Sequence, residues 1–226
     1  LSLPDGDIVG AVAEEIIARN GRRVNTVVDT STIGIAAAER AAGRLHDSEI
    51  EYVDAPVSGG TAGAAQATIA VMVAAADDTY ARLAPTLAGL SKNVFHVGTR
   101  PGQGQAMKLA NNFLPATAMS ATSEAIAFGV TQGLYMGVMV DVLNASSGQN
   151  TATSDKITNR IIPEAYDAGF TNTLLAKDVR LYLEAVAEAG TADEVSQKVV
   201  GVIRRFADVE PGADFTRIYP FVRDRK

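Results

Sequence analysis

The sequence predicts an α/β region with a largely parallel sheet, followed by a region that is all helical. Up to about residue 98, short runs of β-branched residues alternate with Ala-rich stretches that have helical spacing. This alternation is typical of strands in a layer covered by helices. From Gly98 onward the strand pattern disappears and only helical spacing remains. We therefore expect two domains, at residues 1–98 and 99–226.

The expected elements of the first domain follow from the positions of its apolar runs. The predicted strands are Thr26–Val28, Glu51–Val53, Ile69–Val73 and Val94–Val97, and the predicted helices lie near Ile35–Leu45 and around Tyr80–Leu90. The chain opens almost at a strand end, so the sheet is expected to be incomplete. Because the first residue is Leu1 and not Met, we expect a natural N-terminus upstream of it.

The second domain is expected to begin with a Gly-rich connector and a long helix. The long helix is predicted from Ala106 to about Gly133, and Pro115 would ordinarily end or kink it. Further helices are predicted at Val138–Ala145, Thr151–Ile161, Thr173–Ala189 and Ala192–Ala207. In the last of these helices a stripe of four residues near helical spacing is expected in the core, namely Val195, Val199, Val202 and Phe206.

Composition excludes several classes of protein. The 226 residues include 20 Lys and Arg against 26 Asp and Glu, a net charge of −6, which argues against nucleic-acid binding. The absence of Cys removes disulfides and thiolate zinc sites and fits a cytoplasmic protein. The two His are far apart in the sequence, so no metal site is expected. No apolar run approaches the ~18 to 20 residues that span a bilayer, so no membrane association is expected.

The densest polar motif is Gly102-x-Gly104-xxx-Lys108-xx-Asn111-Asn112. On a helix the last three residues share one face, so an ammonium and two carboxamides together can orient an oxygen-rich molecule and exchange a proton with it. A place near the helix start lowers the pKa of a lysine toward the range useful for acid–base catalysis. Spacing alone favours a different interpretation, a solvated lysine beside two asparagines that cap or bridge helices.

Three shorter motifs also contain polar groups suited to binding. The segment Asp54–Gly60 (DAPVSGG) can form an anion-binding nest, although it also fits an ordinary turn. The segment Asp29–Thr32 (DTST) closes a strand where open α/β sheets bind ligands, although helix capping also explains it. The pair Lys177-Asp178 interrupts an apolar helix face, a place where charged pairs are mostly solvated. No G-x-G-x-x-G occurs anywhere in the sequence. The partial match that begins at Gly102 fails because Met107 stands where the third small residue would be.

Taken together and in this order, these segments resemble the β-hydroxyacid dehydrogenase family. The matching stretches are the strand end Leu3-Pro4, DTST, DAPVSGG with the following Gly63, GxGxxxKxxNN and KDxxL, and they extend from residue 3 to about residue 181. The resemblance implies a Rossmann-like dinucleotide-binding domain and a helical domain built on the long helix. It also implies hydride transfer between NAD or NADP and a small 3-hydroxy carboxylic acid, of the 3-hydroxyisobutyrate or tartronate semialdehyde type.

The resemblance also implies a role for each matching residue. Lys108 is similar to the catalytic lysine, a base in oxidation and an acid in reduction. The residues similar to the family's substrate-binding positions are Ser58, Gly59 and Gly60 as a carboxylate cradle, Asn112 at the reacting end and Asn111 in a supporting role. The residues similar to its cofactor contacts are Leu3, Pro4 and Thr32, with Lys177 closing over the cofactor from the helical domain. A homodimer or homotetramer is expected through the helical half.

The chain departs from the family pattern at its start, where the strand and the G-x-G-x-x-G are missing. A second hypothesis is therefore a non-catalytic helical dimerisation module that has lost cofactor binding, although the retained Lys108, Asn112 and Ser58 oppose it. Imine reduction is disfavoured because such relatives replace the lysine, and a decarboxylating sugar-phosphate dehydrogenase is disfavoured by the short helical region. The choice between NAD and NADP stays open, because the residue that reads the ribose would lie upstream.

Overall fold

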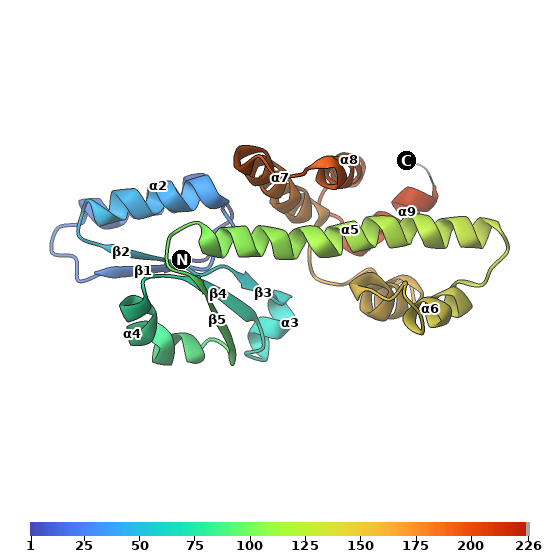
Figure 1. The fold of residues 1–226 in the computed structure, drawn as a ribbon, viewed down its shortest axis with the longest axis horizontal. Helices are drawn as coiled ribbons and strands as arrows, with labels where there is room; N and C mark the ends of the chain where they lie inside the picture. Colours follow the sequence, from blue (N-terminus) through green and yellow to red (C-terminus); the bar gives the residue numbers. More distant parts are fainter. Residues whose placement is uncertain (225–226) are drawn as a thin grey trace. The chain divides into compact units, whose positions relative to one another are not determined.

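The computed structural model describes residues 1–224, and the chain divides within one long helix into two compact units. The first unit comprises Leu1–Ala110, and the second begins at Asn111. Figure 1 shows that the first unit holds all the labelled strands, whereas the second is built from helices. The predicted order, an α/β region followed by a helical one, is therefore confirmed.

The sheet of the first unit has both parallel and antiparallel pairs. Its strands are β1 (Thr26–Asp29), β2 (Glu51–Asp54), β3 (Val57–Ser58), β4 (Ala70–Ala74) and β5 (Asn93–Gly98), in the order β1-β2-β4-β3 with β5 beside β4. The pairs β1–β2 and β4–β5 are parallel, while β4 runs antiparallel to β2 and β3. A parallel crossover needs a dozen or more residues, usually a helix, and the six-residue α3 before β4 is too short to provide one.

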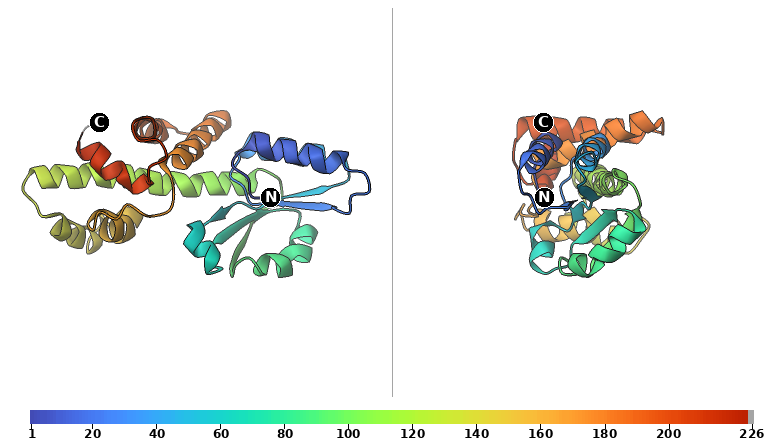
Figure 2. Two further views of the ribbon diagram at one scale, coloured as in Figure 1. Left: turned by 180° about the vertical axis from the view of Figure 1, so that it is seen from behind. Right: turned by 90° about the vertical axis from the view of Figure 1, so that its left-hand side faces the viewer.

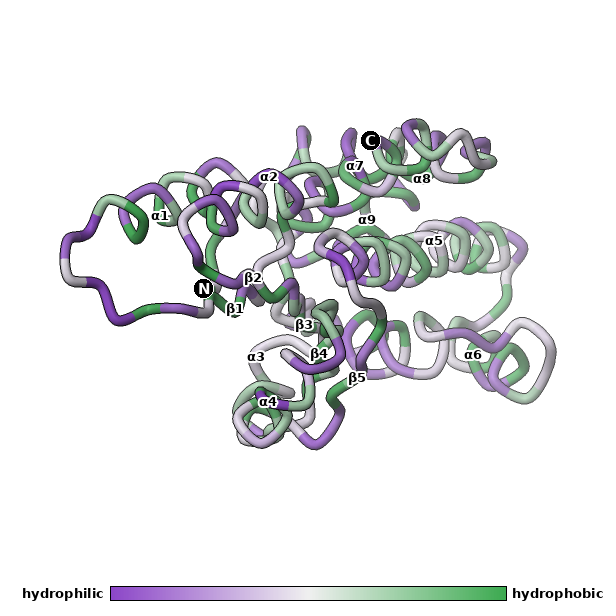
Figure 3. The backbone as a smooth tube through the Cα atoms, turned by 60° about the vertical axis from the view of Figure 1, so that its left-hand side comes forward, coloured by the Kyte–Doolittle hydropathy of each residue, from purple (hydrophilic) through white to green (hydrophobic). Residues whose placement is uncertain are grey.

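Helices cover both faces of this sheet. They are α1 (Gly6–Ala18), α2 (Ile35–His46), α3 (Gly60–Ala65) and α4 (Asp77–Ala88), with α1 and α2 on one face and α3 and α4 on the other (Figures 1 and 2). Helix α1 is absent from the elements expected from the sequence. It begins after Asp5, whose side chain accepts a hydrogen bond from the Ile8 amide at 2.9 Å and caps the helix. Hydrophilic and hydrophobic residues alternate along α1, as Figure 3 shows.

The second unit is a helical cluster with its own core. Its elements are the rest of α5 (Gln103–Thr131), α6 (Met136–Asn144), the π-helix η1 (Ala152–Ile161), α7 (Asn172–Ala189), α8 (Glu194–Val209), the 3₁₀ helix η2 (Phe215–Arg217) and α9 (Ile218–Arg223). Helix α5 continues through Pro115 without ending there. Gly190, at φ 65°, ends α7 and lets the chain turn into α8.

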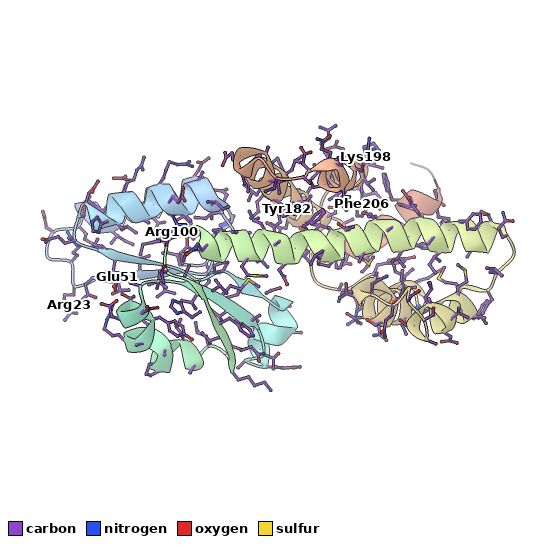
Figure 4. The ribbon with its side chains drawn as sticks, viewed as in Figure 1. Arg23, Glu51, Arg100, Tyr182, Lys198 and Phe206 are labelled. Carbon is purple, nitrogen blue, oxygen red and sulfur yellow. The ribbon has the colours of Figure 1, made fainter. Side chains whose placement is uncertain are left out.

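The apolar stripe on α8 is only partly in the core. Phe206, labelled in Figure 4, is fully buried, and Val199 is 6% exposed. Val202 packs at the edge of the same cluster. Val195 is 59% exposed, so the expectation that all four residues are buried is wrong. It lies in the first turn of α8, whereas the buried apolar residues of this helix lie in its later turns.

Candidate functional site

The carboxyl ends of β1 and β2 bring two buried carboxylates side by side. Asp29 and Asp54 are register partners at the ends of these parallel strands, and both are fully buried. The Asp29 side chain accepts hydrogen bonds from the Tyr52 hydroxyl at 2.9 Å and from the Ser31 amide at 3.0 Å. Burial, the two carboxylate charges and the bond to Asp29 raise the pKa of Tyr52, so its hydroxyl stays a donor.

Asp54 caps the helix that carries the candidate lysine. Its Oδ2 accepts hydrogen bonds from the Gly102 amide at 2.9 Å and the Gln105 amide at 3.1 Å, and its Oδ1 accepts one from Nε2 of Gln105 at 2.7 Å. These two amides lie at the start of α5, where backbone donors have no partner within the helix and the helix dipole favours a negative charge. Burial raises the pKa of Asp54, although the hydrogen bonds from Gln105 and Gly102 oppose the rise.

The two glycines of the G-x-G motif let α5 begin directly against the sheet. A Cβ atom on Gly104 would lie 2.8 Å from the carbonyl oxygen of Met72 and 2.9 Å from that of Asp54, closer than atoms approach in proteins. Gly102 has a φ of +89°, in the left-handed region that favours glycine. The motif therefore lets the helix start pack closely against the end of β2 and the middle of β4.

Lys108 lies on α5 in the first unit, six residues after Gly102, and is only 7% exposed. Lysine is among the residues least often buried, because desolvation of an ammonium is costly. Lys108 is therefore not the solvated lysine that spacing alone favoured.

The candidate cofactor contacts of the first unit lie at the end of β1. The Leu3 amide donates a hydrogen bond to Oγ of Ser31 at 2.8 Å, which brings the segment Leu3-Pro4 beside the DTST loop. Thr32 is half-buried in this loop. The carboxamide of Gln105 bonds the same loop, because Nε2 donates to the Ser31 carbonyl at 3.0 Å and Oε1 accepts from the Ile33 amide at 2.9 Å.

The proposed carboxylate cradle lies at the end of β3. Ser58 is the last residue of that strand, and Gly59 and Gly60 follow at φ values of +134° and +65°. A side chain would be strained at both glycines, and a Cβ on Gly59 would also come within 3.1 Å of Ile69 Cα. Glycine is therefore favoured at both positions of this turn, whose backbone a ligand can approach closely because both glycines are exposed.

In the helical unit, four polar side chains from α5 and α7 come together. Nδ2 of Asn112, a residue 8% exposed, donates to Oδ2 of Asp178 at 2.6 Å, and Nδ2 of Asn111 donates to Oδ1 of Asn112 at 3.2 Å. Nζ of Lys177 lies 3.4 Å from Oδ1 of Asp178. Asp178 is 3% exposed and was given no role from the sequence. A carboxylate on an otherwise apolar helix face is the signal that marks it.

Residues 1–224, the part of the chain that the structure describes, contain no group of three or more His, Cys, Asp or Glu side chains arranged to hold a metal ion. None of their helices combines the length and the apolar character that crossing a bilayer requires.

Both halves of the chain match models of known families. Residues 1–98 match the NAD binding domain of 6-phosphogluconate dehydrogenase. Residues 102–222 match the model described as NAD-binding of NADP-dependent 3-hydroxyisobutyrate dehydrogenase.

Curated relatives and a solved structure agree with these models. The 2-(hydroxymethyl)glutarate dehydrogenase of Eubacterium barkeri is 36% identical over 72% of this chain and 54% of its own length. The 3-hydroxyisobutyrate dehydrogenase of Pseudomonas aeruginosa is 33% identical over 88% of this chain and 70% of its own length. The structure of Mycobacterium tuberculosis 3-hydroxyisobutyrate dehydrogenase with L-serine superposes with a TM-score of 0.90 at 28% identity, over 98% of this chain and 78% of that one. The chain thus spans about half to three quarters of the length of these proteins.

Proposed function

The chain belongs to the β-hydroxyacid dehydrogenase family, whose members are NAD(P)-dependent dehydrogenases acting on a CH–OH group, and from this premise we propose its reaction. The reaction is reversible hydride transfer between NAD or NADP and a small 3-hydroxy carboxylic acid of the 3-hydroxyisobutyrate or tartronate semialdehyde type. The observation that carries the proposal is the burial of Lys108 on a helix capped by the Asp54 carboxylate.

The residues at the end of β1 fit a dinucleotide. Open α/β sheets bind nucleotides beyond the carboxyl ends of their strands, and Leu3, Pro4 and Thr32 lie at this edge. Lys177 supplies a positive charge from the helical unit. When bound, the nicotinamide accepts or returns the hydride. The residues of the chain have the separate tasks of binding the acid, orienting it and moving the hydroxyl proton.

Lys108 performs the proton transfer. In oxidation its neutral amine removes the proton from the substrate hydroxyl, and in reduction its ammonium returns a proton to the carbonyl oxygen. Asn112 holds the reacting end of the substrate, with its amide oriented by Asp178 and Asn111. Ser58, Gly59 and Gly60 bind the substrate carboxylate through the Ser58 hydroxyl and the backbone N–H groups.

The same proposal covers organisation and location. Residues 1–98 form the dinucleotide-binding domain, and residues 99–226 form the domain for substrate binding and self-association. The protein works as a homodimer or homotetramer, in the cytoplasm, on a small acid and without nucleic acid or membrane. Exposed apolar side chains at the end of α5 and on α6 support self-association.

Cofactor binding tests this function against the alternative of a non-catalytic module. Thr32→Ala and Lys177→Ala are each expected to weaken binding of NAD or NADP about 10- to 150-fold, because each removes a hydrogen bond or charge worth ~1.5–3 kcal/mol. One matched control is Thr30→Ala, because the Thr30 hydroxyl donates to the Leu1 carbonyl at 2.8 Å. The other is Lys198→Ala, at an exposed lysine on α8. Titration calorimetry that shows no dinucleotide binding by the protein would favour the module.

A further inference from the structure

We propose that Gln105 is a positioning residue that fixes the cofactor contact Thr32 relative to the proton-transfer group Lys108. The proposal rests on the function given above. Gln105 itself touches neither substrate nor cofactor in this scheme, and it acts through the loop after β1.

The carboxamide of Gln105 bonds both peptide groups that flank Thr32. Its Nε2 donates to the carbonyl of Ser31, which belongs to the peptide group before Thr32, at 3.0 Å. Its Oε1 accepts from the amide of Ile33, which belongs to the peptide group after Thr32, at 2.9 Å, and also from the Gly34 amide at 3.2 Å. A single side chain therefore holds the backbone on both sides of Thr32.

The same carboxamide is anchored on its other side by Asp54. Nε2 of Gln105 donates its second hydrogen to Oδ1 of Asp54 at 2.7 Å, and Oδ2 of Asp54 accepts from the Gln105 amide at 3.1 Å. All four bonding positions of the carboxamide, two hydrogens and two lone pairs, are thus occupied. Gln105 is fully buried, so no water replaces a bond that is lost.

Lys108 follows Gln105 by three residues on the same continuous helix. Residues three apart on a helix are neighbours on its surface, so the position of Gln105 fixes that of the Lys108 backbone. Thr32 is therefore connected to Lys108 through the hydrogen bonds of Gln105 and a single turn of helix α5. An apolar side chain at position 105 would fill the space, but it would leave the loop free to shift on the helix.

Loss of the Gln105 hydrogen bonds is expected to affect the rate of the chemical step more than the binding of acid or dinucleotide. Hydride and proton transfer require the cofactor and the lysine to meet the same carbinol group, and a misplacement of 1 Å can reduce such a rate about 100-fold. Loss of the Gln105 bonds still leaves Thr32 and Lys108 in the protein. We therefore expect kcat to fall while the KM values for acid and dinucleotide change little.

The test compares Gln105→Met with the matched control Gln103→Ala. Methionine resembles glutamine in length but makes none of these bonds. Gln103 also accepts two backbone bonds at the start of α5, from the Thr99 amide at 2.8 Å and the Arg100 amide at 2.9 Å, but it does not bond the loop around Thr32. We expect Gln105→Met to lower kcat about 10- to 100-fold with KM within about threefold. Gln103→Ala is expected to lower the melting temperature and leave kcat within about twofold. Equal losses of kcat in the two variants would overturn the proposal.

A rescue experiment keeps the proposal testable if Gln105→Met does not fold. Gln105→Glu places a carboxylate against Asp54 and is expected to lower kcat at least as much. Adding Asp54→Asn restores a donor opposite the new acceptor. The kcat of the double variant should therefore be about tenfold higher than that of Gln105→Glu. A double variant no faster than Gln105→Glu would contradict a role for this bond.

Hydrogen exchange separates this proposal from the proposed reaction. The amides of Ile33 and Gly34 should exchange at least about tenfold faster in Gln105→Met and at the unaltered rate in Gln103→Ala, because only Gln105→Met removes their acceptor. Unaltered exchange in Gln105→Met would overturn the inference, whatever the turnover. Absence of turnover in the unaltered protein would instead contradict the proposed function.

Discussion

Asn112 on α5 donates a hydrogen bond from Nδ2 to Oδ2 of Asp178 on α7 over 2.6 Å. The same carboxylate lies 3.4 Å from Nζ of Lys177, the proposed cofactor contact of the helical unit. One buried carboxylate thus contacts both Asn112, which we propose to hold the reacting end of the substrate, and Lys177. Within the helical unit, the proposed substrate contact and the proposed cofactor contact share this carboxylate.

Replacing Asp178 should therefore destabilise the helical unit. Asp178→Ala leaves the Asn112 amide without its buried acceptor, and we expect a loss of about 2 kcal/mol in the free energy of unfolding. Asp178→Asn keeps an acceptor without the charge and should lose about half as much. Urea unfolding measures both, with the exposed Asp208→Ala as the control. A loss in Asp178→Ala no larger than in the control would contradict the described bond.

The close packing of the start of α5 against the sheet gives a second prediction. Gly104→Ala places a methyl group against the carbonyl oxygens of Met72 and Asp54, so we expect a loss of about 1–3 kcal/mol in the free energy of unfolding. Gly10, inside α1, has no atom within 4 Å of the position its Cβ would take. Gly10→Ala should instead raise stability by about 0.5–1 kcal/mol. Stabilisation by both substitutions would show that α5 does not begin against the sheet.

The Glu51 carboxylate, labelled in Figure 4, predicts a pH dependence of stability. Burial alone would raise its pKa, but hydrogen bonds from Thr79, Arg82 and Thr26 outweigh this effect and hold the pKa below its ordinary value of 4.5. A carboxylate with a lowered folded-state pKa stabilises the fold above the unfolded value, and this contribution is lost as pH falls through the folded pKa.

Glu51→Gln should therefore make the unfolding free energy less dependent on pH below about 4.5 than in the unaltered protein. At neutral pH the variant should be slightly less stable, with solvent screening keeping the difference small because 35% of the side chain is exposed. Chemical unfolding at a series of pH values checks this, with exposed Glu188→Gln as the control. Parallel pH curves for the Glu51 variant and the unaltered protein would contradict the prediction.

Elements with strong periodicity were predictable from the sequence, and elements fixed by close packing were not. The four expected strands and the long α5 all follow from apolar spacing. Helix α1 contains Gly6 and Gly10, which disfavour helix, but a Cβ on Gly6 would lie 2.6 Å from that of Ala37, so the glycine is needed where α1 packs on α2. The two-residue β3 is too short to show a period.

The candidate site divides in the same way. Spacing on one helix placed Lys108 and Asn112 on a common face, because residues four apart share a face in any helix. Asp54 and Gln105 lie 51 residues apart, and their contact depends on how β2 and α5 pack. Asp178 and Asn112 are 66 residues apart and meet only through the packing of α5 and α7. Tertiary contacts of this kind leave no local pattern.

Self-association is predicted from a surface formed by the end of α5, the turn after it and α6. Five large apolar residues there are 55–74% exposed, namely Phe128, Leu134, Tyr135, Val138 and Val142. Burial of such side chains between copies is favourable, so light scattering at micromolar concentration should show at least a dimer. Tyr135→Glu together with Val138→Glu should yield a monomer, whereas Val24→Glu, in the first unit, should not. A monomer before any substitution would contradict this prediction.

The turnover of Lys108→Met tests the central claim most directly. Removing a positioned acid–base group costs about 10²–10⁴-fold in rate, while methionine fills similar space, so dinucleotide affinity and melting temperature should stay close to those of the unaltered protein. Lys108→Arg should fail as well, because a guanidinium keeps its proton near neutral pH. The measurement is kcat for oxidation of the hydroxy acid, followed by the appearance of reduced nicotinamide. We predict a fall of about 10²–10⁴-fold in Lys108→Met, and retention of most of the turnover would contradict the role of Lys108.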